Sequence, residues 1–409
     1  MAKEYKDLVV GLDIGTAKVM AVVAEVLPNG ELKLAGLGIA ASNGLKRGVV
    51  VNIDATVQSI QQALKEAELM ADCKITRVYT GITGSHIRGM NSSGMVAIKD
   101  REVTAADVAR VVETAKAINI STDQRLLLVE PQEFIIDGQD VREPIGMSGI
   151  RLEAKVHIVT GAQSAAENII KCVRRCGLEV EQLMLNPLAS SLSVLTEDER
   201  ELGVALVDIG AGTTDIAIFT NGAIRHTAVI PIAGDLITSD IAMALRTPTK
   251  DAEDIKVENG YAKQLLADPD TQVEVPGLGD RSPRMLSRQA LAGVIEPRVE
   301  EIFQLVHQVL RDSGFEEMLS SGIVLTGGSC IMPGMVELGE DIFLKPVRRG
   351  IPKYSSALAD MVAQPRAATV MGLLEEARMA RLRGFKVAQK NGSMKTAAGQ
   401  LKDWFTGIF

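Results

Sequence analysis

Two segments of the sequence combine strand-like apolar runs with a carboxylate, glycines and hydroxyl residues. The first, LVVGLDIGTAKVMAVVAEV, contains Asp13, Gly15, Thr16 and Lys18, and the second, LVDIGAGTTDIAIF (residues 206–219), repeats the device about half a chain later. Glycines let backbone N–H groups approach an anion closely, while threonine and lysine side chains add donors and positive charge. The repetition therefore predicts two related domains that face each other across the phosphates of a nucleotide.

An aspartate in each hairpin would repel phosphate unless a cation lay between them. Asp13 and Asp208 therefore indicate Mg²⁺, a hard ion that proteins hold with a few carboxylates together with phosphate oxygens. The nucleotide contacts expected from the second hairpin are Gly210, Gly212, Thr213 and Thr214. A structural alternative stays open, because Asp, Gly and Thr are also ordinary residues of hairpin turns.

A third segment, GIVLTGGSCIMPGM, predicts a strand at 322–326 that ends in Gly327, Gly328 and Ser329. Glycines after a strand let a flat base and its ribose lie against the main chain. Earlier in the chain, AEDIKVENGYA places Glu253 and Lys256 on one face of a predicted helix. Charges at this spacing are also typical of a solvated helix face.

These three segments, in this order, resemble the superfamily of actin, heat-shock 70-type chaperones and sugar kinases. Within it, SDIAMAL, AELMADCKI, LASSLSVLTEDERELGVALVDIG and GIVLTGG resemble the FtsA family of bacterial actin-like cell-division proteins, and the resemblance covers nearly the whole chain. It implies an α/β, actin-like two-domain ATPase fold with ATP and Mg²⁺ as cofactors. In the superfamily, a Glu and a Lys at the spacing of Glu253 and Lys256 contact the adenosine.

In actin-like relatives, a polar or acidic residue at the connection between the two halves helps to position the attacking water. This chain has Asn186 there, in LMLNPLASS, and asparagine can orient a water but cannot take its proton at neutral pH. Asp208 is the other residue expected to position the metal and the water. We therefore expect ATP binding with at most slow hydrolysis, so that the nucleotide acts chiefly as a clamp.

The alternation of strand and helix patterns indicates an α/β fold. The segment 53–71 predicts a helix, whereas 84–162 predicts a small α+β insertion with a hairpin in HIRGMNSSGMVAI and a helix at 104–118. By the resemblance, this insertion is the FtsA subdomain 1C. The expected boundaries are 1–83, 163–195 and 355–380 for subdomain 1A, 84–162 for 1C, 196–234 and 301–354 for 2A, 235–300 for 2B, 381–392 for a linker, and 393–409 for an amphipathic helix.

Composition restricts the class of protein. The 409 residues carry a net charge of −8, which argues against nucleic acid as the main partner. No stretch approaches the ~18 apolar residues of a membrane span, and the N-terminus lacks the apolar run of a signal peptide. Four cysteines without dense spacing indicate a reducing cytosol, and Cys172 and Cys176 are more typical of small buried residues than of metal ligands.

The last 29 residues differ from the rest, with six basic residues and one acid. RLRGFKVAQKNGS predicts a flexible linker, and MKTAAGQLKDWFTGIF predicts an amphipathic helix after Ser393. Such a helix suits the surface of an anionic membrane, and FtsA-like proteins end in one. Docking of the helix on the body, or in the groove of a partner protein, is the alternative. The membrane contacts expected are Leu401, Trp404, Phe405, Ile408, Lys395 and Lys402.

The resemblance implies a filament-forming protein that anchors the ring of tubulin-like FtsZ to the cytoplasmic face of the inner membrane at the septum. The implied partners are the C-terminal peptide of FtsZ, further copies of the chain and other divisome proteins. We expect the peptide on 235–300, where Arg281, Arg284 and Arg288 could meet an acidic partner, although a solvated loop has the same pattern.

Other classes of protein with this fold fit less well. A heat-shock 70-type chaperone needs a large peptide-binding domain after the ATPase, and a sugar kinase needs a dedicated acidic base between the halves. A PilM-like pilus-assembly protein shares the fold and the binding of a partner peptide, so it is the main alternative. The predicted linker and amphipathic tail are the features that distinguish this chain from such proteins.

Overall fold

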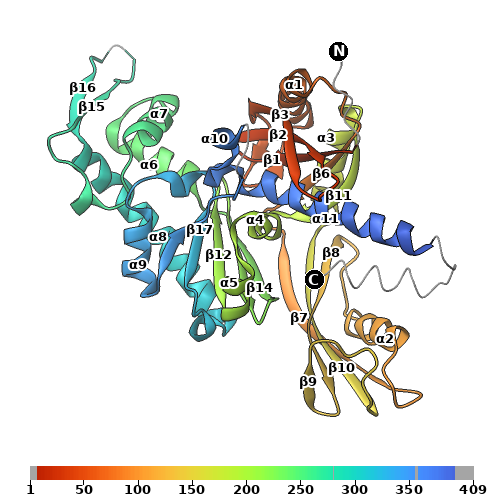
Figure 1. The fold of residues 1–409 in the computed structure, drawn as a ribbon. Helices are drawn as coiled ribbons and strands as arrows, with labels where there is room; N and C mark the ends of the chain where they lie inside the picture. Colours follow the sequence, from red (N-terminus) through yellow and green to blue (C-terminus); the bar gives the residue numbers. More distant parts are fainter. Residues whose placement is uncertain (1–6, 280, 355–357, 392–409) are drawn as a thin grey trace.

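The computed structural model describes residues 7–279, 281–354 and 358–391, and it is built on two five-stranded sheets (Figure 1). The first sheet has the order β11-β6-β1-β2-β3 and the second the order β14-β13-β12-β17-β18. In each, an antiparallel hairpin (β1–β2 or β12–β13) pairs in parallel with a later strand (β6 or β17). The duplication predicted from the two hairpin motifs is therefore confirmed in the topology.

The bounds of the strands follow from their apolar runs. Those of the first sheet are β1 Leu8–Ile14, β2 Lys18–Val26, β3 Leu32–Ala41, β6 Arg77–Ile82 and β11 Glu179–Leu185. Those of the second are β12 Val204–Ile209, β13 Thr214–Thr220, β14 Ala223–Ile230, β17 Ile323–Thr326 and β18 Val347–Arg349. Two short strands, β4 Leu45–Lys46 and β5 Val49–Val50, form a separate ribbon.

Helices cover both faces of the first sheet, which explains why its strands are apolar on both sides. Alternate side chains of β2 enter different cores: Val19 packs in the core with α1 and α3, whereas Met20 packs in the core with α11. Small residues bring α11 close, because a Cβ on Gly372 would lie 1.6 Å from the Ala189 carbonyl oxygen of α4. The helices are α1 Ile53–Ala71, α3 Gln163–Arg175, α4 Asn186–Val194 and α11 Ala368–Asn391.

The second sheet carries its own helices and an outer part at the far end of the molecule, at the upper left of Figure 1. The outer part consists of α6 Gly234–Leu245, α7 Thr249–Asn259, a 3-10 turn at Gln264–Leu266, the hairpin of β15 Gln272–Val275 and β16 Arg284–Ser287, and the start of α8 Arg288–Ser313. The remaining helices are α5 Glu197–Leu202, α9 Met335–Phe343 and α10 Ala359–Val362, with 3-10 turns at Glu316–Met318, Gly328–Ile331 and Pro365–Ala367.

The insertion is a four-stranded sheet, β7-β10-β8-β9, with one helix on it. Its elements are β7 Arg88–Ala97, α2 Ala105–Ala115, β8 Gln124–Ile136, β9 Gln139–Val141 and β10 Arg151–Ala162. The hairpin predicted in HIRGMNSSGMVAI is wrong, because β7 is one strand that pairs with β10 along its whole length. Gly94 does not form a turn. It allows α2 to pack closely on the strand, because a Cβ there would lie 2.4 Å from the backbone nitrogen of Ala115 in α2.

Polar contacts dock the insertion on edge strand β14 of the second sheet. The buried ring of His157 lies between Asn91 Oδ1, 2.6 Å from Nδ1, and Thr227 Oγ1, 2.9 Å from Nε2. Burial lowers the pKa of His157 to about 3, and His226 adds to the shift. Arg225 Nη1 pairs with Glu133 at 2.6 Å. Interfaces of this polar kind are typical of domains that can shift relative to one another.

Glu130 of β8 lies in the same region. Burial raises the pKa of its carboxyl to about 7; the positive charge of Arg200 opposes the shift and Glu376 adds to it.

Glu130→Gln is expected to reduce the pH dependence of folding stability. The pKa of Glu130 is raised above its ordinary 4.5 in the folded protein, so its contribution to stability is complete below about pH 4.5 and is lost as the pH rises to about 7. Each pH unit in this window changes the free energy of unfolding by up to about 1.4 kcal/mol. Urea unfolding of both proteins between pH 5 and 8 should give a flatter profile for the variant; parallel profiles would contradict the assignment.

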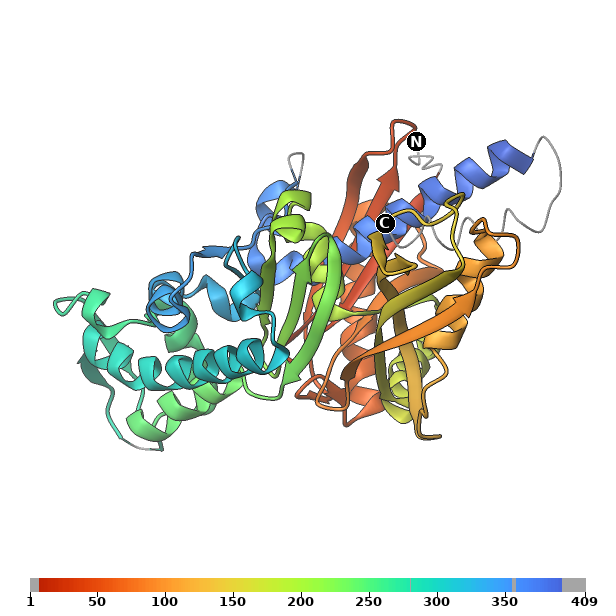
Figure 2. The same ribbon diagram turned by 90° about the horizontal axis from the view of Figure 1, so that it is seen from below.

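The linker predicted at 381–392 is wrong for residues 381–391, because helix α11 continues through them. Most residues of this segment are good helix formers, and a single glycine, Gly384, costs a helix only about 1 kcal/mol. Arg381 also pairs with Asp7 at 3.3 Å and with Glu181 at 3.7 Å. In both views α11 extends away from the body at its C-terminal end (Figures 1 and 2). The predicted amphipathic helix, 393–409, lies outside the described residues.

Within the part of the chain that the structure describes, no helix has the length and apolar character needed to cross a bilayer.

Candidate nucleotide site

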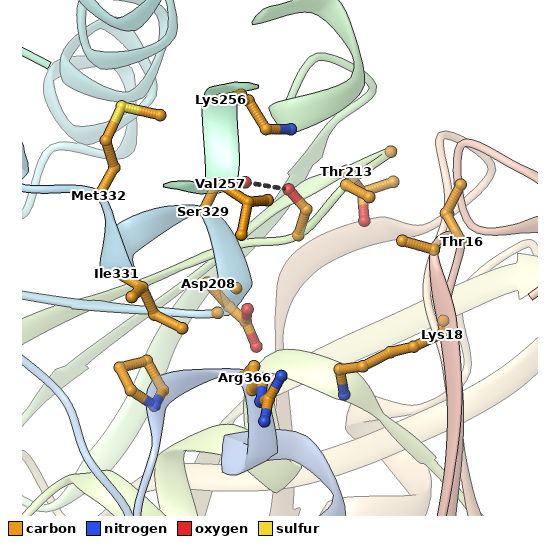
Figure 3. Close-up of a pocket in the computed structure, with 18 of the residues that line it drawn as sticks. Thr16, Lys18, Asp208, Thr213, Lys256, Val257, Ser329, Ile331, Met332 and Arg366 are labelled. Carbon is orange, nitrogen blue, oxygen red and sulfur yellow. Dashed lines mark hydrogen bonds between the residues drawn. The ribbon is translucent and has the colours of Figure 1, made fainter. Parts of the chain in front are cut away.

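A cavity of about 560 Å³ lies where the two hairpin motifs meet, and residues of both domains line it. This volume lies within the ~300–1,000 Å³ that ligand pockets usually have. In Figure 3, Thr16 and Lys18 of the first domain project from one side, opposite Asp208 and Thr213 of the second. The cavity lies between the two domains, as the paired motifs predict.

The two hairpin tips have the same turn. Gly15 N–H donates to the Lys18 carbonyl at 2.9 Å, and Gly210 N–H donates to the Thr213 carbonyl, also at 2.9 Å. The third motif closes against the second hairpin, because the Ser329 hydroxyl donates to the Gly210 carbonyl at 2.8 Å. Gly327 has φ +87°, and a Cβ there would lie 2.4 Å from Asp208 Oδ1, so a side chain is excluded. The glycines thus leave main chain exposed to the cavity.

Asp13 and Asp208 are both buried at the cavity. Asp13 has a cationic partner, because Lys18 Nζ lies 3.4 Å from its Oδ2. Asp208 Oδ2 accepts from the Ser190 hydroxyl at 2.6 Å and from the Thr369 hydroxyl at 3.4 Å. Burial raises the pKa of Asp208 to about 6, the Ser190 hydrogen bond opposes the shift, and the charge of Asp13 adds to it. This electrostatic environment favours a cation near Asp208.

Asp215 is a third buried carboxylate of the cavity, and the sequence motifs alone did not mark it as a site residue. It accepts hydrogen bonds from the hydroxyls of Thr83 and Thr213, so it links the residue that follows β6 in the first domain to the second hairpin. Burial and the neighbouring charge of Asp208 raise its pKa to about 7. A signal was available, since side chains alternate along a strand and Asp215 shares a face with Thr213.

Asn186, the first residue of α4, also lines the cavity. Its Oδ1 is buried and has no hydrogen-bond partner among the described residues. Buried polar oxygens are usually satisfied, so this orphan acceptor fits a group that the cavity would supply, such as a water molecule.

The other end of the cavity is formed by α7 and the loop after β17. Lys256 is buried, and its Nζ donates to Glu253 Oε2 at 2.7 Å, to the Thr238 hydroxyl at 2.8 Å and to the Gly234 carbonyl at 3.2 Å. The predicted Glu–Lys pair on one helix face is therefore present at the cavity. Apolar atoms of Tyr261 and Met332 complete this wall.

The structure brings most of the predicted site residues together. Those that line the cavity are Asp13, Gly15, Thr16, Lys18, Asn186, Asp208, Gly210, Gly212, Thr213, Glu253, Lys256, Gly327, Gly328 and Ser329. Thr214 does not line it, so the expectation for this residue is wrong. Its side chain points to the opposite face of β13, where the hydroxyl donates to the Ile232 carbonyl at 2.8 Å.

The three arginines expected to meet a partner peptide lie in two places. Arg281 and Arg284 are exposed, and Arg284 Nη2 donates to the Leu245 carbonyl at 2.6 Å. Arg288 instead lines the nucleotide cavity, so its prediction as a residue of an outer loop is wrong. Arg288 is the first residue of helix α8 and is half-buried.

The residues present fit Mg·ATP. Glycine-lined backbone at two hairpin tips suits phosphate oxygens, and the buried carboxylates suit a divalent cation. Among the described residues no group of three or more His, Cys, Asp or Glu side chains could hold a metal ion by itself. Phosphate oxygens would have to complete the coordination of Mg²⁺, as they commonly do.

Comparison with known proteins gives the family. Residues 205–372 match the family described as "Cell division protein FtsA", and residues 84–160 match "SHS2 domain inserted in FTSA". The FtsA of Pseudomonas aeruginosa is 55% identical over 98% of this chain and 98% of its own length. The chain belongs to the FtsA family. The FtsA proteins of Neisseria meningitidis and Escherichia coli are 52% and 46% identical over 97% and 99% of this chain and over 98% and 99% of their own lengths.

The FtsA match confirms a cell-division protein and decides against the pilus-assembly alternative. It also confirms the insertion, which begins where the sequence pattern changes at residue 84.

Solved structures share the actin-like fold. The PilM–PilN type IV pilus biogenesis complex matches with a TM-score of 0.65 at 18% identity, covering 92% of this chain and 99% of that chain. MreB5 of Spiroplasma citri bound to ADP matches with a TM-score of 0.57 at 16% identity, covering 92% and 98%. At these identities the comparison establishes the fold of this FtsA-family chain and no more.

Proposed function

We propose that this FtsA-family protein binds Mg·ATP between its two domains and tethers FtsZ filaments to the cytoplasmic face of the inner membrane at the division septum. The observation that carries the proposal is the cavity formed by two equivalent glycine-rich hairpins, with buried carboxylates where a cation is needed. The solved MreB5 structures bound to ADP and to AMPPNP support a nucleotide in a fold of this kind.

The residues divide the task of holding the nucleotide. Asp13 and Asp208 would hold the Mg²⁺, which neutralises phosphate charge when it is bound. Gly15, Thr16, Lys18 and Thr213 would bind phosphate oxygens, and Glu253 with Lys256 would bind the adenosine end. Because these groups come from both domains, ATP would act as a clamp that holds the domains together.

Slow hydrolysis follows from Asn186. Its orphan Oδ1 can orient a water molecule, but asparagine cannot accept the proton, and general-base assistance typically contributes about 10² to 10⁴ in rate. Phosphate release by the purified protein with Mg·ATP is expected to stay below about 1 per second, the low end of the ordinary enzyme range. A faster turnover in the absence of partners would contradict the clamp.

Partner binding is proposed on the outer part of the second domain. Arg281 and Arg284 are exposed there, and Met285, also exposed, lies on the opposite face of β16 from Arg284. Exposed arginines and an exposed apolar side chain in one short segment suit a peptide that carries acidic and apolar residues, such as the C-terminal peptide of FtsZ. Self-assembly into actin-like filaments and contacts of the insertion with other divisome proteins belong to the same proposal.

The decisive experiment is recruitment of FtsZ to anionic vesicles. With Mg·ATP, the protein should carry FtsZ to the vesicles in a sedimentation assay, and omission of either ATP or this protein should reduce recruitment. The matched control is FtsZ without its C-terminal peptide, which should stay in solution. If the truncated FtsZ were recruited equally well, the C-terminal peptide of FtsZ would not be the segment that binds this protein.

A further inference from the structure

Arg288 connects the outer part of the second domain with the nucleotide cavity. It is the first residue of α8 and comes directly after strand β16, and its backbone N–H donates to the Thr271 carbonyl at 2.8 Å, next to β15. Its side chain lines the cavity. The hairpin β15–β16 and the cavity wall therefore meet at one residue.

The guanidinium of Arg288 is poorly satisfied by the described residues. Nη2 lies 3.5 Å from Asn259 Oδ1, at the limit of a hydrogen bond, and the buried Nε–H has no hydrogen-bond partner among them. A positive charge in the first turn of a helix is also unfavourable, because the N–H groups there are partly positive. Arg288 thus contributes little to the stability of the helix, which points to a role toward a ligand.

The position of Arg288 selects one end of the cavity. Its neighbour Asn259 is the last residue of α7, which also supplies Lys256 and Val257 to the wall. In Figure 3, Lys256, Val257 and Met332 lie on one side of the cavity, and Thr16 and Lys18 lie on the other. The phosphate-binding hairpin of the first domain is therefore remote from the wall that Arg288 belongs to, and the base or ribose is the part of a nucleotide that this wall faces.

We propose that Arg288 contacts the base end of the bound nucleotide and thereby makes the β15–β16 hairpin sensitive to ATP. This inference rests on the nucleotide binding proposed above. A guanidinium can bind phosphate oxygens, but it also stacks on aromatic faces and donates hydrogen bonds to ring acceptors, and the wall that carries Arg288 is remote from the phosphate-binding hairpin of the first domain, so the base is the part of the nucleotide within its reach. The same contact fixes the start of α8, and with it the strand that presents Arg284 and Met285 to solvent.

The experiment compares Mg·ATP with Mg·tripolyphosphate, which has phosphates but no base, in titrations that displace a fluorescent nucleotide. Arg288→Met is expected to weaken ATP about tenfold and to leave tripolyphosphate unchanged, consistent with the size of exposed to partly buried cation–π contacts. Arg288→Lys should retain part of the ATP affinity. Arg311→Met, an exposed arginine at the opposite end of the same helix and outside the cavity, is the matched control and should bind both ligands as the wild type does.

Hydrogen exchange of the wild-type chain tests the coupling without any variant. ATP, but not tripolyphosphate, should slow exchange at the amides of 284–288. The base contact would be overturned if Arg288→Met bound ATP with wild-type affinity, or if the affinities for ATP and tripolyphosphate fell equally. The coupling would be overturned if both ligands slowed hydrogen exchange at 284–288 equally. If the wild-type chain binds neither ligand, the proposed nucleotide function fails instead, so the two failures are distinguishable.

Discussion

Asp208→Asn is expected to weaken binding of Mg·ATP by about 100-fold, because the variant loses a negative charge that would hold the metal. Asparagine has nearly the same shape, and its carbonyl oxygen can still accept the hydrogen bond from Ser190, which lies 2.6 Å from Asp208. The loss of a group that ligates or orients a metal typically costs up to about two orders of magnitude in affinity. A titration with a fluorescent ATP analogue measures the change.

Removal of Mg²⁺ provides a control in which the variant is expected to show no loss of ATP affinity. Without divalent cations, Asp208 only repels the phosphates, so the same variant should bind ATP as well as or better than the wild type when EDTA is present. A comparable loss in EDTA would mean that Asp208 supports the hairpin and not the metal. The unfolding midpoints of the two proteins should be compared alongside, because the raised pKa of Asp208 shows that its charge is costly in the folded protein.

Trp404→Glu combined with Phe405→Glu is expected to abolish binding to anionic vesicles and to leave ATP binding intact. Burial of one large apolar side chain contributes about 1.5 to 3 kcal/mol, and a basic residue near an anionic leaflet about 1 kcal/mol. Removal of two anchors costs at least about 3 kcal/mol, which is a factor of about 100 or more. These residues lie outside the described part of the chain, so the prediction rests on the apolar spacing of the sequence.

Thr396→Glu with Thr406→Glu is the matched control for the tail. It adds the same two charges on the face opposite the predicted apolar stripe, and it should reduce vesicle binding much less. Flotation with vesicles measures both variants, and the fluorescence of Trp404, the single tryptophan, should shift to the blue with anionic lipid in the wild type. If the Trp404 and Phe405 variant still floats, the membrane anchor lies elsewhere.

Local chemistry made the cavity predictable from the sequence. Asp13, Ile14 and Gly15 recur as Asp208, Ile209 and Gly210 in a second hairpin, and a glycine at each turn lets the backbone approach an anion closely. The pair of Glu253 and Lys256 was predictable because residues three apart share a helix face. These predictions depend on residues near one another in the chain.

The errors arose where distant segments decide the outcome. Thr214 has the right chemistry for a phosphate, but strand alternation sends its hydroxyl to the Ile232 carbonyl. Arg288 lies in a polar stretch, yet it is half-buried and lines the cavity. Asn-Ser-Ser-Gly is typical of a turn, yet in β7 the glycine makes room for α2. Each case depends on tertiary packing, which local pattern does not contain.

Helix α11 determines the direction in which the chain leaves the body of the protein at Asn391. It begins at Ala368, beside Thr369 and the nucleotide cavity, and it runs without interruption for 24 residues to Asn391, a length of about 36 Å. In a flexible segment, the direction of the chain becomes independent of its starting direction within a few residues. In a helix, each residue is instead rotated by about 100° around the axis relative to the previous one. A residue added within 384–391 therefore swings the exit direction of the chain around the axis far more than it lengthens the chain. The orientation of Asn391 around the helix axis is thus fixed relative to the body of the protein.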